Sequence, residues 1–308
     1  MGAPSVRPVL HHAALRLEGP SGRAPEIAVA DLHLGLGSLG GEGLVFAQGR
    51  ASEMAREIQE VAREEGARGV IVAGDVKHPI FGASAPVGRI LFEFFSTLLA
   101  SGLRVRVVPG NHDQGLARHL PREVEMIEAG GLLRGTVGLF HGHAWPSDRL
   151  GKARTLVAGH LHPGYRLAPG RIDGGKQRCW IRVALGPSIP PRPRRTLRAE
   201  ELIVLPAFNP LSGIEPLNQK RPASGRSFLF SRFLARGTAR AYLLDGTDLG
   251  ELRLDRRGRI PLAAAGTGAV DRGDAPLPPR DGHRRASTGG RTGPIPSQST
   301  PRRAQSGR

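Results

Sequence analysis

Residues 27–35 read Ile-Ala-Val-Ala-Asp-Leu-His-Leu-Gly, a short apolar run that ends in the triplet Asp31-Leu32-His33. An apolar run of this length, bounded by polar and glycine residues, is typical of a buried strand. The same pattern recurs along the chain, because four further motifs follow apolar, β-branched runs in a fixed order. These motifs are Gly74-Asp75, Gly110-Asn111-His112-Asp113, His141-Gly142-His143 and Gly159-His160-Leu161-His162. The sequence therefore predicts a set of strands whose C-terminal ends carry acidic, amide and imidazole side chains.

Helices are expected between the early strands. Residues 52–65 and residues 86–100 each place apolar side chains on one helical face, and a glycine follows each stretch. A shorter helix is predicted over residues 121–129, where two glycines follow. The glycine-rich residues 35–49 are predicted to form a loop, and they contain no Gly-Lys-Ser/Thr sequence of the nucleotide-binding type.

Alternating strands and helices favour an α/β fold, and because later strands lack long helices between them, the sheets are expected to be mixed. In α/β sheets of the open type, sites form at the C-terminal ends of the strands, where the motifs lie. A terminal hairpin is expected over residues 241–254, with its turn at Asp245-Gly246, and the proline- and arginine-rich residues 189–198 are expected to form a loop. Strands are predicted over residues 13–17, 27–30, 69–73, 103–108, 136–140, 155–158, 180–184 and 201–205.

The composition changes after the hairpin. Residues 255–308 contain eleven arginines against four aspartates and no aromatic residue. A segment of this kind cannot bury enough apolar surface to fold, so a disordered C-terminal tail is expected beyond a domain over residues 1–254. The tail is either a solvated extension without function or an electrostatic arm for nucleic acid.

The chain is strongly basic, with a formal net charge of +17, and nearly all of the positive residues are arginine. The planar guanidinium suits phosphate recognition, so the charge favours nucleic acid or another polyanion as a partner. Codon usage biased towards G and C would enrich arginine without regard to function, and it is the alternative explanation of the arginine count.

Cys179 is the single cysteine, which excludes a disulfide framework within the chain and fits a reducing cytoplasm. Cys179 lies between Arg178 and Trp180 in a strand-like run, which predicts a buried core thiol. No stretch approaches the ~20 apolar residues that span a bilayer, and the N-terminus lacks the apolar region of a secretory signal. A cytoplasmic protein without membrane segments is therefore expected.

The five motifs together supply carboxylate, amide and imidazole ligands and no thiolate. This donor set suits two divalent metal ions that share one carboxylate. A water between two such ions loses a proton near neutral pH and attacks phosphorus in line. Each motif alone is weak, since a single Asp-x-His or Gly-Asp occurs by chance, but their conjunction in one order predicts a metal-dependent phosphoesterase.

In this order the motifs resemble the pattern of the calcineurin-like metallophosphoesterase superfamily. A closer resemblance is to the SbcD-related and ligase-associated DNA-repair phosphoesterases of archaea and bacteria, and it runs from about residue 7 to 254. It is carried by residues 30–35, 74–78, 160–163 and 205–211. The resemblance implies a four-layer sandwich in which two mixed β-sheets pack face to face with helices outside, and it implies DNA-repair proteins as partners.

The resemblance also implies a ligand set for two metal ions, expected to be Mn²⁺, with Fe, Zn or Co as alternatives. The first ion would be held by Asp31, His33 and His162. The second ion would be held by Asn111, His141 and His160. The carboxylate of Asp75 would bridge the two ions.

The remaining polar residues of the motifs have implied or open roles. His112 would contact the phosphate and protonate the leaving group, and Asp113 would orient its ring. His141 is expected to bind metal by analogy, while His143 either supports it or is structural. Lys77 and the neighbouring His78 either line the phosphate pocket or cap a loop.

Three functions fit these residues. The first is hydrolysis of phosphodiester bonds in nucleic acid or nucleotides, which the net charge and the closer resemblance favour. The second is a phosphomonoesterase or nucleotide phosphatase that uses the same metal ions. The third is a scaffold that keeps the fold without catalysis, and the complete set of ligands argues against it.

Overall fold

Two mixed β-sheets carry the fold of the computed structural model, which describes residues 6–19, 22–167, 175–186, 197–218, 228–234 and 237–252. The first sheet has the order β1-β2-β3-β4-β5-β6, antiparallel from β1 to β3 and parallel from β3 to β6. Its strands are β1 (Val6–Val9), β2 (Ala14–Leu17), β3 (Glu26–Val29), β4 (Gly69–Ala73), β5 (Arg104–Val108) and β6 (Glu125–Met126).

The second sheet has the order β13-β10-β11-β12-β9-β8-β7, and β14 pairs with both β11 and β15. Three neighbouring strands, β12, β9 and β8, run parallel to one another. Its strands are β7 (Leu132–Arg134), β8 (Val137–Phe140), β9 (Thr155–Ala158), β10 (Pro163–Arg166), β11 (Lys176–Ala184), β12 (Glu201–Val204), β13 (Glu215–Pro216), β14 (Thr238–Leu243) and β15 (Asp248–Leu252).

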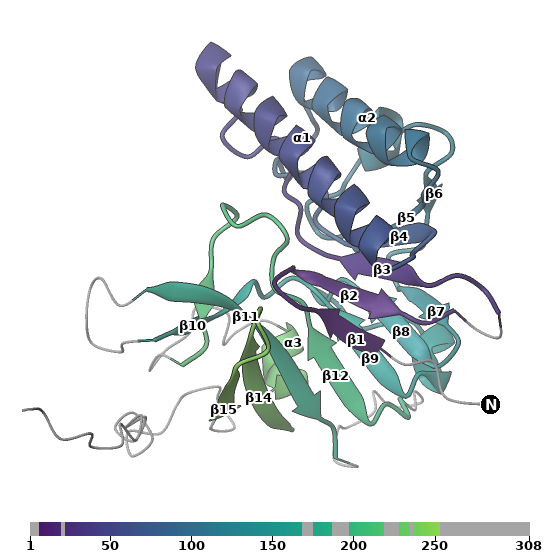
Figure 1. The fold of residues 1–308 in the computed structure, drawn as a ribbon, viewed down its shortest axis with the longest axis vertical. Helices are drawn as coiled ribbons and strands as arrows, with labels where there is room; N and C mark the ends of the chain where they lie inside the picture. Colours follow the sequence, from purple (N-terminus) through teal and green to yellow (C-terminus); the bar gives the residue numbers. More distant parts are fainter. Residues whose placement is uncertain are drawn as a thin grey trace, which may run out of the picture. The chain divides into compact units, whose positions relative to one another are not determined.

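The two sheets pack face to face, with helices on their outer faces. Alternate residues of each strand point to opposite faces of its sheet. Ala28 of β3 and Ile71 of β4 therefore pack against Val157 and Trp180 of the second sheet, in a core shared by both sheets. The opposite face of the first sheet is covered by α1 (Gly40–Glu64) and α2 (Ala85–Ala100), which lie side by side in Figure 1. The outer face of the second sheet packs against α3 (Phe228–Arg232). The predicted α/β sandwich of two mixed sheets is confirmed.

Two predicted elements differ from the structure. The helix α1 begins at Gly40, inside residues 35–49, where a loop was predicted. Ala47 and Ala51 of this first part are buried against the core, and this packing outweighs the low helix propensity of its glycines. The predicted helix over residues 121–129 is wrong, because this stretch forms turns and the short strand β6, which pairs with the edge of β5.

The other predicted elements agree closely with the structure. The helix predicted over residues 86–100 is α2, which begins one residue earlier with a proline in its first turn and Ser84 as its N-cap. The predicted hairpin turns at Asp245-Gly246 between β14 and β15. Cys179 is fully buried, as expected, and burial raises the pKa of its thiol. The predicted tail and most of the loop predicted over residues 189–198 lie outside the described residues. In the part of the chain that the structure describes, no helix combines the length and apolarity needed to span a bilayer.

A buried ion cluster joins the two sheets at the beginning of β3. Glu26 is 1% exposed, and its carboxylate accepts hydrogen bonds from Arg106 of β5 at 2.5 Å and from Arg134 of β7 at 2.6 Å. Burial alone would raise the pKa of Glu26, but the two arginines outweigh it and hold this pKa below its ordinary value. Since Arg134 belongs to the other sheet, this cluster holds the sheets together at the end opposite the motifs.

Candidate metal centre

The five sequence motifs meet at one edge of the two sheets. Asp31 and His33 follow β3, and Asp75 and Asn111 follow β4 and β5, which are parallel neighbours in the first sheet. The remaining motifs follow β8 and β9, which are parallel neighbours in the second sheet. The loops after these strands continue to pair beyond the strands themselves, since Asp31 N–H donates to the carbonyl of Gly74 and Gly159 N–H to the carbonyl of His141, both at 3.0 Å.

Asp75 lies at the centre of this edge, and its two carboxylate oxygens face different histidines. Oδ1 is 3.3 Å from Nε2 of His141, whereas Oδ2 is 3.8 Å from Nε2 of His33 and 3.9 Å from Nε2 of His112. The side chain of Asp75 is 4% exposed, so few water molecules compete for its oxygens. A carboxylate in this position is able to hold one cation with each oxygen.

A second carboxylate, that of Asp31, is fully buried beside the last motif. Its two oxygens accept hydrogen bonds from the backbone N–H of His160 at 3.2 and 2.9 Å, which fixes the carboxylate. Oδ1 also lies 3.6 Å from Nε2 of His162. The Nε2 atoms of His33 and His162 are 3.1 Å apart, the kind of separation expected of two ligands of one ion.

Three groups of side chains could each hold a metal ion, with ligand atoms within 4.8 Å of one another. Six of the seven predicted ligands belong to these groups, and the seventh, Asn111, has its Oδ1 3.2 Å from Nε2 of His141. The three groups are Asp31, His33 and His162; His33, Asp75 and His112; and Asp75, His141 and His160. The structure thus brings all seven residues to one place.

Backbone carbonyls hold the rings of three of these histidines by Nδ1. The Nδ1 atom of His141 is 3.0 Å from the carbonyl of Ala73, that of His162 is 3.2 Å from the carbonyl of Ser212, and that of His112 is 2.6 Å from the carbonyl of His78. A carbonyl accepts only, so each Nδ1 carries the proton, and a neutral ring then presents the lone pair of Nε2 to the centre. This arrangement of a histidine ligand is common at metal sites.

The predicted role of Asp113 is corrected by these contacts. The His112 ring is held by the His78 carbonyl, and the carboxylate of Asp113 accepts backbone N–H bonds from Gly110, Val76 and Lys77 at 2.8 to 3.2 Å. Burial is the main reason why the pKa of Asp113 is raised. Asp113 therefore ties the loop after β4 to the loop after β5, and it acts on His112 through the backbone.

The structure also separates the alternatives for the residues around the motifs. The amine of Lys77 is buried and donates to the carbonyls of Pro79 and Ile80, so this lysine caps its own loop. The ring of His78 lies 5.6 Å from that of His33 and borders the site. His141 lies beside Asp75, whereas the ring of His143 lies 5.3 Å behind that of His141, outside the three ligand groups.

The glycines that precede the ligands have a packing reason. A β-carbon on Gly74 would lie 2.2 Å from Nδ1 of His141, and one on Gly110 would lie 2.2 Å from Oδ1 of Asp75. Real side chains do not approach so closely. The glycine in each motif therefore leaves room for a ligand from another motif, and this explains why Gly-Asp and Gly-Asn-His occur together in one chain.

The backbone of the site is strained. A non-glycine residue with positive φ is uncommon and costs of order 1–3 kcal/mol. Among the described residues, His11 is the one non-glycine example that lies outside the centre. The others are Asp31 (φ 58°), His33 (43°), Asp75 (50°), His160 (75°) and His162 (45°). Strain of this kind collects at functional sites, where the surrounding structure imposes it.

Charges in the site fall into two pairs. Burial alone would raise the pKa of Asp31 and of Asp75, but His162 and His141 beside them hold both below the ordinary value. Burial likewise opposes the charge on His141, but the hydrogen bond and charge of Asp75 and the charge of Asp31 raise its pKa to about 9. Burial lowers the pKa of His33 to about 4. Each buried carboxylate is thus paired with a histidine whose pKa is raised, Asp75 with His141 and Asp31 with His162, where the Asp31 carboxylate raises the pKa against burial.

These residues fit divalent cations. The donor set is carboxylate, amide oxygen and imidazole, which Mn, Fe, Co and Zn ions all accept. The Nε2 atoms of His141 and His162 face Asp75 and Asp31, so neutral rings would offer these atoms to a cation. In addition, Nδ1 of His33 is buried without a hydrogen-bond partner, as are Nδ1 of His78 and His143. A buried cluster of carboxylates and imidazoles, some of whose polar atoms have no partner, fits a site for cations.

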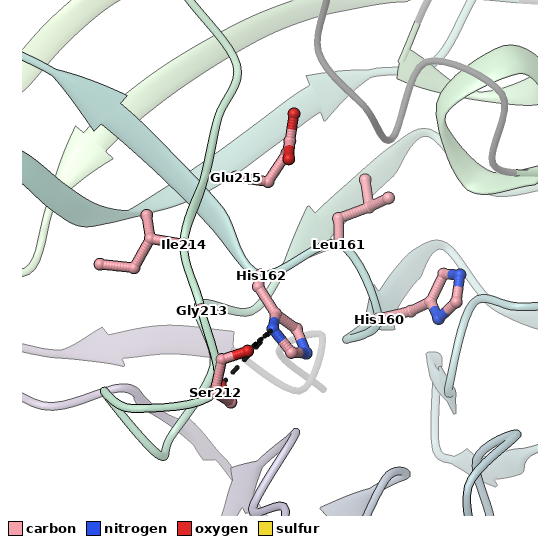
Figure 2. Close-up of a pocket in the computed structure, with 7 residues that line it drawn as sticks. All are labelled: His160, Leu161, His162, Ser212, Gly213, Ile214 and Glu215. Atoms are coloured by element: carbon pink, nitrogen blue, oxygen red, sulfur yellow. Dashed lines mark hydrogen bonds between the residues drawn. The ribbon is translucent and has the colours of Figure 1, made fainter. Parts of the chain in front are cut away.

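A cavity of about 360 Å³ opens beside this centre, lined by residues 160–162 and 212–215. Figure 2 shows His160 and His162 on one wall and the segment with Ser212 on another, with the Ser212–His162 contact dashed. No role is predicted for Ser212 from the sequence, because a carbonyl that positions a ring leaves no signal there. Asn209 was noted only within the stretch 205–211, and it is buried with its amide donating to the carbonyl of Leu32 at 3.0 Å.

A protein-family model agrees with this fold. The family model for calcineurin-like phosphoesterases matches residues 27–182, just over half of the 308 residues. No curated protein matches the chain. Among solved structures, the nuclease MPE of Pseudomonas putida shares 18% identity over 80% of this chain and 100% of its own, with a TM-score of 0.47. The phosphoesterase Yfce of E. coli shares 16% identity over 73% of this chain and 97% of its own, with a TM-score of 0.31.

Proposed function

The chain belongs to the calcineurin-like phosphoesterase family, a family of metal-dependent hydrolases, and we propose that it hydrolyses phosphodiester bonds in nucleic acid or nucleotides with two divalent metal ions. The observation that carries this proposal is the position of Asp75, whose two oxygens face two separate groups of histidines. A single shared carboxylate is what a two-metal site requires. We assign Mn²⁺ as the metal on the basis of the resemblance of the motifs.

Asp31, His33 and His162 would hold one ion, Asn111, His141 and His160 would hold the other, and Asp75 would be the ligand that both share. When bound, the ions lower the pKa of a water that serves as the nucleophile and screen the charge of the phosphoryl oxygens. The protein residues hold the ligand rings by their Nδ1 atoms and exclude bulk water from Asp31 and Asp75. Such preorganisation removes the cost of rearranging the site during reaction.

His112 is the proposed proton donor. Its Nδ1 is held by the carbonyl of His78, and its Nε2 faces the open side of Asp75 at 3.9 Å, where the phosphate would lie. Its side chain is 19% exposed, more than that of His33 or His141, so a substrate is able to reach it. When both ring nitrogens carry a proton, the ring is placed to give the one on Nε2 to the leaving oxygen and to keep the one on Nδ1 bonded to His78. Asp113 supports this ring through the loop backbone.

A phosphodiester substrate is favoured by two features. The cavity beside His160 and His162 offers room for one arm of a diester while the other arm leaves past His112. The net charge of +17 favours a polyanionic substrate such as nucleic acid. A phosphomonoesterase would use the same metal ions and the same proton donor, and the second arm of the substrate is what separates the two functions.

The test is hydrolysis of single-stranded DNA and of bis-p-nitrophenyl phosphate by the full chain with Mn²⁺, beside p-nitrophenyl phosphate as a monoester. We expect the diesters to be cleaved, and Asp75→Asn to lose more than about 100-fold in activity together with bound manganese, because a shared ligand is removed. Asp245→Asn removes a carboxylate at the hairpin turn and is the matched control. Cleavage of the monoester alone would reject the diester proposal, and full activity of Asp75→Asn would reject the metal centre.

A further inference from the structure

Exposed apolar side chains gather on the segments that leave the metal centre. Nine large apolar residues are exposed among those that the structure describes, and six of them lie on segments that follow Asp31-His33, Asp75 or Asn209. We call four of them the apolar rim. The rim consists of Leu39 (92% exposed), Phe46 (53%), Ile80 (46%) and Phe81 (85%).

The rim is connected to the site through two loops that pair with each other. Leu34, directly after His33, forms a parallel bridge with Lys77, and the N–H of His78 donates to the carbonyl of Leu34 at 2.9 Å. Phe46 lies over the first loop, since a β-carbon on Gly37 would be 3.4 Å from its ring. Phe81 lies on the second loop, three residues after His78, whose ring borders that of His33.

The second loop is held in place. The buried amine of Lys77 donates to the carbonyls of Pro79 and Ile80, and the carbonyl of His78 is bonded to the ring of His112. Three extended residues span at most about 11 Å, so the backbone of Phe81 lies no further than that from the backbone of His78. This distance is on the order of three stacked bases at 3.4 Å each. An exposed aromatic ring is thus presented on a fixed backbone close to the proposed proton donor.

Exposure of this kind has a cost in water, and the loop does not hide the ring. Nothing in the catalytic chemistry assigned to Asp75 and His112 uses an apolar group. Aromatic rings beside a phosphate site are the usual means of binding unpaired bases, because each base offers a flat face for stacking. Leu39 at the end of the neighbouring loop and Phe46 on α1 are further exposed apolar side chains on the segment that follows His33. The amine of Lys77 is buried and donates to carbonyls of its own loop, so it is not available to a phosphate.

We propose that Phe81 is a base-stacking residue, which binds an unpaired nucleobase next to the phosphodiester at the metal centre. This inference rests on the proposed function and adds to it the substrate class, a single-stranded nucleic acid with at least one base outside a duplex. Ile80, the member of the apolar rim that precedes Phe81 in the chain, adds exposed apolar surface to the same loop, and the phosphate remains at the metal centre.

The test compares two oligonucleotides of equal length and charge with the full chain and Mn²⁺. One is single-stranded DNA that contains 2-aminopurine, and the other carries abasic residues in place of the bases. We expect Phe81→Ala to raise KM and the dissociation constant for the first by about 5- to 150-fold, the range found for loss of one stacked base, and to leave the abasic oligonucleotide unchanged. Phe81→Trp should restore binding, and quenching of 2-aminopurine fluorescence should follow the same order.

Phe92→Ala is the matched control, because Phe92 is also an exposed phenylalanine (52%) but lies on α2, beyond the loop that carries Phe81. Equal binding of both oligonucleotides by Phe81→Ala and wild type would overturn the inference. A dimer of the wild type that Phe81→Ala converts to a monomer, with unchanged binding of the base-containing strand, would show instead that the rim joins two copies. Absence of cleavage of both oligonucleotides by wild type would refute the proposed function, while fluorescence quenching would still report on the base-stacking site.

Discussion

Replacement of Gly74 by alanine should weaken metal binding without changing a ligand. The β-carbon of Gly74→Ala would lie 2.2 Å from Nδ1 of His141, whereas ordinary contact begins near 3.4 Å. The ring must therefore retreat by roughly 1 Å, which breaks the Nδ1 bond to the carbonyl of Ala73 and moves Nε2 from its place 3.3 Å from Asp75. Loss of a residue that merely positions a ligand typically costs 10- to 100-fold in metal affinity. We expect a loss at the upper end of this range, about 100-fold.

The same substitution also strains the backbone, because Gly74 has φ of 90°. Gly66→Ala is the control for this effect, since Gly66 has φ of 62° and open space at its β-carbon. Both variants should lose about 1–3 kcal/mol of stability from the positive φ. Only Gly74→Ala should also lose the stabilisation that manganese provides. A 100-fold loss of affinity for the ion lowers that stabilisation by about 2.7 kcal/mol when the ion is in large excess.

The assay is urea unfolding of each variant with and without Mn²⁺, together with calorimetric titration of the ion. Manganese should stabilise wild type and Gly66→Ala equally and Gly74→Ala much less. If Gly74→Ala does not fold, Gly110→Ala replaces it, because its β-carbon would lie 2.2 Å from Oδ1 of Asp75 without a positive φ. Equal stabilisation of Gly66→Ala and of the foldable variant would refute the argument that these glycines make room for the ligands.

Three further outcomes are expected. Glu26→Gln should lower the free energy of unfolding by about 3–5 kcal/mol at pH 7, because two partly buried arginines lose their carboxylate. Since the folded pKa of Glu26 is lowered, this difference should be complete above pH 4.5 and shrink as the pH falls through the folded pKa. Urea titrations at several pH values measure the difference, and a difference independent of pH would contradict the prediction. The folded pKa of His141 is raised from 6.5 to about 9, so the stability that its proton contributes to the metal-free protein is complete below pH 6.5 and lost as the pH rises through 9. Manganese must displace that proton, so its affinity should rise from pH 7 to 9. Calorimetry in buffers of different ionisation enthalpy should show the release of the proton. Lys77→Met should leave two loop carbonyls without their donor and lower the free energy of unfolding by about 1–3 kcal/mol. Activity should fall with it, whereas Lys77→Arg should keep both. An unchanged midpoint of urea unfolding in Lys77→Met would count against this prediction.

The contact between Glu26 and two arginines illustrates where sequence reasoning ends. Residue 26 directly precedes a well-predicted strand, but its partners lie 80 and 108 residues away in two different sheets. No local pattern reports such a distance. In the same way, the first three turns of α1 contain four glycines, and only burial of Ala47 and Ala51 against the first sheet makes them helical.

The metal centre likewise has features that a local sequence pattern predicts and features that depend on distant segments. The sequence alone indicated the ligand types and their positions at the ends of strands, because an apolar run of four or five residues followed by Asp, Asn or His is a local pattern. It did not indicate how the rings are oriented. His112 was expected to be oriented by Asp113, its neighbour in the sequence, whereas the carbonyl of His78 holds the ring.

Most of the strands, the helix α2 and the types of ligand at the site could be predicted from the sequence, since they depend on side chains that are close together along the chain. Tertiary structure alone decided which oxygen of Asp75 faces which histidine, which carbonyl holds each ring, and why Gly74 and Gly110 must lack a side chain. The physical reason is that backbone carbonyls are the same at every residue and that close approach is a property of two segments. Neither leaves a signal in one sequence until the two sheets have packed together.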